Sequence, residues 1–251
     1  GGKTSDTVTV SNAVHITGSP AEVTAALVTA GTKVEVTDAT VTITGNPDIS
    51  VLNAIADETT GVVTATLAAA SLSSLGTLST ASTDVITITV NDADNEAVTA
   101  TDLSTLGGKT AGTVTVSNAV DISGTPAEVT AALVTAETKV EVTDATVTIT
   151  GNPSISQLNA IAAETTGVVT ATLSPASLSS LGSLSTASTD RITIYVNDAD
   201  NTTVTATALS TLGGKTADTV RVTEAVHITG DHDQVTAALV TDATKVVAST
   251  A

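Results

Sequence analysis

The chain of 251 residues contains no Cys, Met, Trp or Phe, and a single Tyr, Tyr195. Without cysteine it can form no disulfide and no thiolate metal site, and it has no cysteine nucleophile. Basic residues are scarce too, since 8 Lys and Arg stand against 26 Asp and Glu, for a formal net charge of -18. An acidic chain without stacking aromatic residues is unsuited to binding nucleic acid. These absences exclude disulfide scaffolds, thiolate chemistry and a nucleic-acid interface.

The apolar content of the chain indicates a folded protein. Hydrophobic residues make up 41% and charged residues only 14%, and the mean hydropathy is +0.34. A disordered acidic segment has too little apolar surface to offset the entropy that folding costs. We therefore expect a core, built from Val, Ile, Leu and Ala.

An internal repeat with a period of 106 residues organises the sequence. GGKTSDTVTVSNAVHITG at residue 1 returns as GGKTAGTVTVSNAVDISG at residue 107 and as GGKTADTVRVTEAVHITG at residue 213. We call residues 1–106 copy one, residues 107–212 copy two and residues 213–251 the partial copy three. Repeats of this kind stack on their neighbours. We expect one continuous structure, and an excerpt from a longer array.

Each copy contains four finer units of about 26 residues, and each unit opens with a short helix. The expected helix starts are Pro20, Pro47, Ser71, Thr101 and Pro126. In the first unit Ser19 is placed to cap the helix, with Glu22 where a capping box requires its acid. These helices are too short to be stable alone, so they must pack on neighbouring units.

Alternating apolar residues after the helices predict short strands. The inward-facing residues are Val34 and Val36; Val63, Ala65 and Leu67; Ile86, Ile88 and Val90; and Val114 and Val116. In several units a second strand follows after a change of parity, as at Val41 and Ile43 or at Val120 and Ile122. The change of parity predicts a bend between two narrow sheets.

The pattern predicts an α/β solenoid, in which each coil of about 26 residues holds a short helix and one or two short parallel strands. The alternative is a tandem array of all-β sandwiches of immunoglobulin or cadherin type. A period of 106 residues suits such a domain, and DVITITVNDADN at residues 84–95 is similar to the closing strand of bacterial sandwich repeats. The helical stretches, the finer period and the missing aromatic core residue favour the solenoid.

The Thr/Ala/Val-rich segments AEVTAALVTAxTKVEVTDATVTITG, LNAIAxETTGVVTATL and SLSSLGxLSTASTDxITI extend over nearly the whole chain. This composition and style resemble the β-strand-repeat regions of very large bacterial surface proteins, of the marine cyanobacterial type. The resemblance implies an exported protein with a structural role at the cell surface, as an adhesin, a surface-layer component or a motility-associated protein. The calcium-binding nonapeptide GGxGxDxUx found in such chains is absent here, so its mechanism is not implied.

The motif NDADN follows a predicted strand in both full copies. It supplies Asn91, Asp92, Asp94, Asn95, Asn197, Asp198, Asp200 and Asn201. Oxygen ligands at alternate positions of a turn are what Ca²⁺ prefers, so these residues form a candidate calcium site. The other interpretation is an acidic, solvated turn, because Asp and Asn bind their own backbone at bends. We expect no other cofactor.

Two further motifs carry no catalytic chemistry. GGKT occurs three times, but Leu103 and Leu209 stand where a phosphate-binding loop requires its first glycine. His15 and His227 occupy equivalent positions, yet copy two has Asp121 there, and His232 lies at a variant helix start. No Ser–His–Asp arrangement recurs, so we expect no catalytic residue and no enzyme.

Thr residues alternate with the inward-facing residues of the strands, as in Thr40, Thr42 and Thr44, or Thr64 and Thr66. Outward threonine ladders on a flat solenoid face can order water, which suggests ice binding. Thr is favoured on any exposed strand, however, and Lys33 and Glu35 interrupt the ladder. We expect no thermal hysteresis.

The expected function is that of a non-catalytic structural repeat segment, which forms a stalk, a surface layer or a filament outside a bacterial cell. Its partners would be neighbouring repeats of the same long chain, or other copies associating end to end. We expect no nucleic acid, no membrane insertion and no small-molecule substrate. The alternative function is a ligand-binding module, for Ca²⁺ at the NDADN turns or for ice on the threonine face.

Overall fold

A computed structural model describes residues 1–138, 140–244 and 246–248. Short helices alternate with short strands, and the strand pairings described are all parallel. The α/β class predicted from the sequence is therefore confirmed. The sandwich alternative is wrong, because its sheets would be antiparallel and free of helices.

Packing divides the chain into two units, which are described separately. Unit 1 contains Gly1–Ala93, Thr101–Asn118 and Ala131–Val142, and unit 2 contains Asp94–Ala100, Ala119–Thr130 and the chain from Thr143 onward. Helices α4 (Ala100–Gly107) and α5 (Pro126–Leu133) contribute residues to both.

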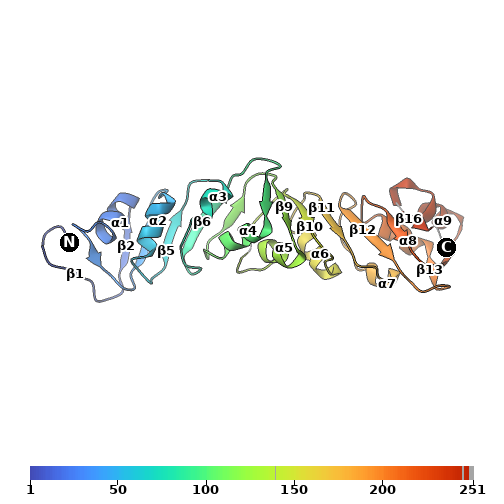
Figure 1. The fold of residues 1–251 in the computed structure, drawn as a ribbon, viewed down its shortest axis with the longest axis horizontal. Coiled ribbons are helices and arrows are strands. Elements are labelled where there is room, and N and C mark those ends of the chain that lie inside the picture. Colours follow the sequence, from blue (N-terminus) through green and yellow to red (C-terminus); the bar gives the residue numbers. More distant parts are fainter. Residues whose placement is uncertain (139, 245, 249–251) are drawn as a thin grey trace. The chain divides into compact units, whose positions relative to one another are not determined.

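Unit 1 is built on a five-stranded parallel sheet with the order β2-β4-β5-β6-β8, and β1 and β3 pair separately (Figure 1). The strands are β1 (Val8–Thr9), β2 (His15–Gly18), β3 (Val34–Glu35), β4 (Thr40–Ile43), β5 (Val63–Thr66), β6 (Val85–Val90) and β8 (Val114–Val116). The helices between them are α1 (Pro20–Leu27), α2 (Ile49–Ala56) and α3 (Leu72–Leu75).

Unit 2 is built on a seven-stranded parallel sheet with the order β16-β14-β12-β11-β10-β9-β7, and β13 and β15 form a second sheet. The strands are β7 (Ala97–Thr99), β9 (Asp121–Gly124), β10 (Thr146–Ile149), β11 (Val169–Thr172), β12 (Arg191–Val196), β13 (Thr203–Thr205), β14 (Val220–Val222), β15 (His227–Thr229) and β16 (Val246–Ala248). The helices are α6 (Ile155–Ala162), α7 (Leu178–Leu181), α8 (Ala206–Gly213), α9 (His232–Leu239) and the short η1 (Asp242–Thr244).

The two six-residue strands each pair with different neighbours along their two halves. The first half of β12, from Arg191 to Thr193, pairs with β11, and its second half, from Ile194 to Val196, pairs with β14. Strand β6 is shared in the same way between β5 and β8. As a result, the seven-stranded sheet includes β7 from copy one, four strands of copy two, and β14 and β16 from copy three. The ends of the sequence repeat are not ends of the sheet.

Stacked aliphatic residues form the core of each unit. In unit 1, Val41 is in register with Val63 and Ala65 with Ile86; these side chains are at most 4% exposed. In unit 2, Ile122, Val147 and Val169 form one buried row across three strands. Because a shift of one residue would turn every side chain to the other face, this alternation fixes the register.

Two glycines allow neighbouring backbone segments to approach closely. A Cβ atom on Gly61 would lie 2.4 Å from the carbonyl oxygen of Ala39, and one on Gly167 would lie 2.3 Å from that of Ala145. Only glycine fits at such a distance without a shift of the backbone.

The predicted element positions agree with the structure in part. Helices α1 and α5 begin at Pro20 and Pro126, as predicted. Pro47 is wrong as a start, since α2 begins at Ile49 after the N-cap residue Asp48, and Ser71 is an N-cap rather than a helical residue. Strands β7 and β13, after the two NDADN turns, were not predicted.

A capping box opens α1 and depresses the pKa of its acid. The side chain and the backbone N–H of Ser19 donate to Glu22 Oε2 at 2.7 and 2.8 Å. Donation from the Ser19 hydroxyl, and then from its N–H, lowers the pKa of Glu22 below its ordinary value of 4.5. Helix α9 has the same kind of box, in which Gln234 takes the place of Glu22 and accepts from the N–H of Asp231.

We predict that Glu22→Gln will reduce stability at neutral pH but not in acid. Glu22 has a depressed pKa in the folded chain, so its contribution exists above the unfolded value and is lost as pH falls through the folded value. Urea unfolding at a series of pH values should show the gap between wild type and variant closing as the pH falls. A gap that stays constant with pH would contradict the assignment.

Candidate functional site

The second NDADN motif forms the turn between β12 and β13, and its two carboxylates bind backbone amides. Asp198 Oδ2 accepts a hydrogen bond from the N–H of Leu178, the first residue of α7, at 2.7 Å. Asp200 Oδ1 accepts one from the N–H of Ala225 at 2.9 Å. Asn201 adopts φ 63°, in the left-handed region that Asn tolerates, and its N–H donates to the Ala225 carbonyl at 2.7 Å. Asn197 donates its N–H to the carbonyl of Ala176 at 3.1 Å.

The first NDADN motif makes the same bonds. Asp92 Oδ2 accepts from the N–H of Leu72, the first residue of α3, at 2.7 Å. Asp94 Oδ1 accepts from the N–H of Ala119 at 3.0 Å. Within the same motif, the N–H of Asn91 donates to Ala70 at 3.0 Å, and Asn95 adopts φ 61°. The turn predicted from the sequence is therefore present in both copies, with its carboxylates bound to neighbouring segments.

These bonds leave one carboxylate oxygen of each aspartate for any other ligand. Over residues 1–138, 140–244 and 246–248, no group of three or more His, Asp or Glu side chains lies close enough to hold a metal ion. Calcium binding at the motif stays a prediction, and would have to use these remaining oxygens together with Asn side chains.

Sequence reasoning missed the two most deeply buried carboxylates. Asp190 is 3% exposed, and its Oδ1 and Oδ2 accept hydrogen bonds from the N–H groups of Val169 at 2.9 Å and Ala187 at 2.8 Å. Asp84 is also 3% exposed and accepts from Val63 and Ala81, both at 2.8 Å. Since Val63 and Val169 begin β5 and β11, each aspartate binds the N–H at the start of a neighbouring strand.

The threonines of the second and third GGKT motifs, Thr110 and Thr216, are buried next to these aspartates. Thr110 Oγ1 accepts from the N–H of Ile86 at 2.7 Å and lies 3.0 Å from the carbonyl oxygen of Asp84. Thr216 repeats the arrangement with the N–H of Ile192 at 2.8 Å. The first glycine of GGKT ends helix α4 and helix α8, whereas a phosphate-binding loop leads into the start of a helix. At residues 107–110 and 213–216, GGKT is thus the end of a helix followed by a buried hydroxyl group.

Two asparagines make a third type of bond between segments. Asn53 donates its Nδ2 to the carbonyl of Thr77 at 2.9 Å and accepts from the N–H of Ser79 at 2.9 Å. Asn159 makes the equivalent bonds with Ser183 and Ser185, at 2.9 and 2.8 Å. A single amide side chain therefore satisfies both a donor and an acceptor of the neighbouring loop.

We call these polar side chains the clamp residues. They are Asn53, Asp84, Asp92, Thr110, Asn159, Asp190, Asp198 and Thr216. Most of their partners lie 20 to 26 residues away along the chain, which is about one repeat unit. The signal that could have found them is the recurrence of a polar residue at the same place in both copies, beside an apolar strand or helix.

His15 and His232 contact neighbouring polar side chains. His15 Nδ1 lies 2.8 Å from Thr40 Oγ1 on the neighbouring strand. In copy two the carboxylate of Asp121 accepts from the hydroxyl of Thr146 instead. His232 begins α9 and is exposed, 3.1 Å from Asp233 Oδ1, so the predicted variant helix start is confirmed.

Outward hydroxyl groups form rows across both sheets. In unit 1, Thr17, Thr42 and Thr64 are in register, and Val85 ends the row. The longest row in unit 2 contains Thr99, Ser123, Thr148 and Thr170, and Arg191 ends it. The outward orientation predicted for the threonines is confirmed for Thr40, Thr44 and Thr66, which are exposed, whereas Thr42 and Thr64 are half-buried.

Comparison with known proteins found no matching family model, no matching curated protein and no matching solved structure. In the described part of the chain, no helix has the length and apolar character needed to cross a membrane.

We predict that Asp190→Ala will destabilise the chain by about 2 to 5 kcal/mol, because it leaves the buried N–H of Val169 and the partly buried N–H of Ala187 without an acceptor. The matched control is Asp144→Ala, which removes an exposed carboxylate from the same unit and should change stability by less than about 0.5 kcal/mol. Urea unfolding of the two variants measures both effects. Equal stability of the two variants would show that the buried bonds of Asp190 contribute nothing.

Proposed function

We propose that this chain is a non-catalytic structural repeat segment of a bacterial extracellular surface protein. Its coils of about 26 residues would stack as an α/β solenoid into a stalk, a surface layer or a filament. The observation that carries the proposal is the use of the clamp residues, whose polar groups bind the backbone of neighbouring segments. The side chains that resemble a site in the sequence are thereby engaged in holding segments together.

The sheet of unit 2 supports a structure that grows by repetition. It includes strands of all three copies in parallel order, and the same pair of bonds to Asp84 recurs at Asp190. A further copy could add strands with the same contacts, as in other repeat proteins whose segments contact only their neighbours. A structural role requires only this repetition and length.

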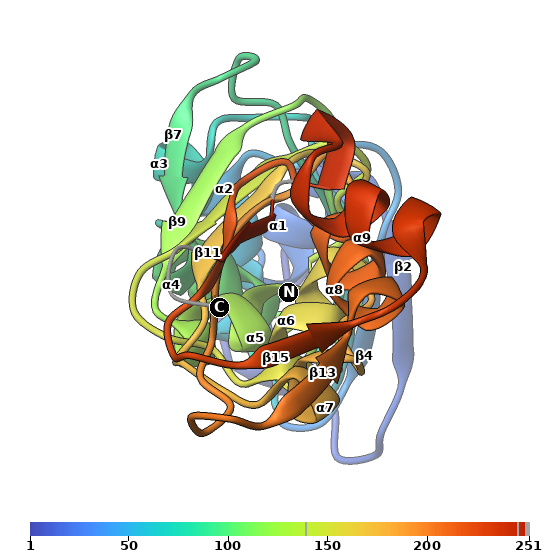
Figure 2. The ribbon, with the colours of Figure 1, turned by 90° about the vertical axis from the view of Figure 1, so that its right-hand side faces the viewer.

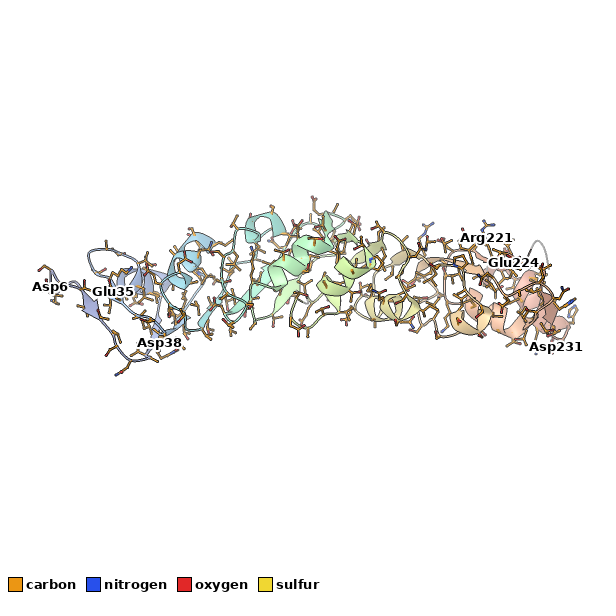
Figure 3. The ribbon with its side chains drawn as sticks, turned by 60° about the horizontal axis from the view of Figure 1, so that its bottom comes forward. Asp6, Glu35, Asp38, Arg221, Glu224 and Asp231 are labelled. Atoms are coloured by element: carbon orange, nitrogen blue, oxygen red, sulfur yellow. The ribbon has the colours of Figure 1, made fainter. Side chains whose placement is uncertain are left out.

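The surface charge supports a role in which separate chains stay apart. Asp6, Glu35 and Asp38 are exposed in unit 1, and Glu224 and Asp231 are exposed in unit 2 (Figure 3). With a formal net charge of -18, like charges keep separate chains soluble. Lateral association would require cations or partner surfaces.

A ligand-binding module is the second candidate function. The row of Thr99, Ser123, Thr148 and Thr170 favours ice binding, because four exposed or half-buried hydroxyl groups stand in parallel register. The charged Arg191 ends that row, which limits the flat surface offered to ice. For calcium, the remaining oxygens of Asp198 and Asp200 are the candidates.

Electron microscopy of an array with four or more copies tests the proposed architecture. We expect a thin rod that lengthens in proportion to the number of copies, without constrictions. A string of separate globules would overturn the proposal, because each copy would then close on itself.

Titration with calcium separates the two candidate functions. For the structural role we expect no binding heat with CaCl₂ and no change in Tm. The control variant carries both Asp94→Asn and Asp200→Asn, which keep oxygens that can accept from Ala119 and Ala225 but remove a charge that calcium would need in each motif. A calcium-dependent rise in Tm that these two substitutions abolish would favour the ligand-binding module.

A further inference from the structure

One apolar face of unit 2 is partly uncovered. It is formed by α9 and β15, which lie beside α8 and β13 (Figure 2). Leu239 is 39% exposed and Val240 is 72% exposed. Leu239 borders a hollow in the surface together with Val226, Ile228 and Val235. We call this surface the α9–β15 face.

The repeat shows what covers the equivalent face in copy one. Leu27 and Val23, the counterparts of Leu239 and Val235, are 0% and 1% exposed. Helix α2 packs against α1 there, and β4 pairs with β2. The N–H of Thr40 donates to the carbonyl of Val14 at 3.0 Å. The cover is thus a single strand–turn–helix segment, residues 40–56.

Copy two provides the same strand cover a second time. Strand β10 pairs with β9, and the N–H groups of Thr146 and Thr150 donate to the carbonyls of Val120 and Gly124 at 3.0 and 2.8 Å. Helix α6 follows β10 after the same Gly-Asn-Pro turn sequence. Residues 40–56 in copy one and residues 146–162 in copy two share the pattern TVTITGNPxISxLNAIA. The same pattern therefore occupies this position in both copies.

Within the described residues, copy three contains no strand–turn–helix segment that covers this face. Strand β15 pairs with β13 along one edge, and within the described residues no strand pairs with its other edge. The carbonyls of Val226 and Gly230 correspond to those that bind the covering strand in copies one and two. The face therefore offers a free strand edge beside an apolar helix surface.

We propose that the α9–β15 face binds a strand–turn–helix segment of the sequence type TVTITGNPxISxLNAIA, supplied by another repeat of this kind. The proposal deepens the proposed structural function and depends on it for the identity of the partner. The strand of the segment hydrogen-bonds to the free edge of β15, and its helix covers Leu239 and Val235, as in other strand additions and helix-in-groove contacts.

Two features of the segment suit this particular face. Residues 146–162 contain no charged side chain, so they approach an acidic chain without repulsion. The first threonine of the segment would meet His227 as Thr40 meets His15, whose Nδ1 lies 2.8 Å from the Thr40 hydroxyl. This contact supports the register that the alternation of buried side chains sets.

The test is amide hydrogen exchange of β15 in the full chain and in a fusion. The fusion continues the chain after Ala248 with the sequence of residues 143–173, which keeps the period of 106 residues. We expect the amides of Ile228 and Gly230, which lie on the free edge because His227 N–H donates to β13, to exchange slower in the fusion by on the order of tenfold or more. A synthetic peptide of residues 143–173, added to the unmodified chain, should protect the same amides at high concentration.

The matched control is a fusion of equal length whose appended segment carries Val147→Asp and Ile149→Asp, which prevent burial of the strand. We expect it to exchange like the unmodified chain. Equal exchange in the two fusions would overturn the proposal. Protection that rises with the concentration of the unmodified chain alone would also overturn it, since a second copy in another mode would then cover the face.

These readouts are independent of the test of the proposed function. Protection of β15 by the fusion, together with globular beads in electron micrographs, would contradict the proposed rod and support the proposed binding face. A continuous rod without protection of β15 would contradict only the proposed binding face.

Discussion

Side chains of neighbouring segments accept hydrogen bonds from the backbone N–H groups at the starts of strands and helices. The rest of the structure depends on these hydrogen bonds. Val63 and Val169 donate to buried aspartates, and Leu72 and Leu178 donate to the aspartates of the NDADN turns. A buried N–H without an acceptor costs far more than a typical hydrogen bond contributes. Each segment is therefore incomplete until the next one is in place.

This constraint gives a structural role to polar side chains that the sequence presents as candidate site residues. The NDADN carboxylates have the composition of a cation site, yet one oxygen of each binds an amide of another segment. Thr110 of the second GGKT motif accepts a hydrogen bond from a strand N–H, and Gly107, the first glycine of that motif, ends helix α4. In a thin core of stacked aliphatic residues, such polar groups are the means of specifying which segment lies next to which.

Local patterns predicted much of the fold because they depend on residues near one another in the chain. Alternation identified the inward faces of β4, β5 and β6, and the Ser-Pro-Ala-Glu box located the start of α1. Strand β7 was missed because it has only three residues and exists through pairing with β9, about 25 residues away. The burial of Asp84 was missed for the same reason, since its partner Val63 comes from a different segment.

The divided pairing of β6 and β12 has a consequence for how such chains change in length over evolution. Each of these strands completes one row of strands with its first half and begins another with its second half. A deletion of one 26-residue segment would place clamp residues beside segments that lack their partner groups. Loss or gain of 106 residues would keep every clamp residue beside its partner. Changes in chain length should therefore occur in whole copies, so natural variants of this gene would differ by multiples of 106 residues rather than by a few residues at a time.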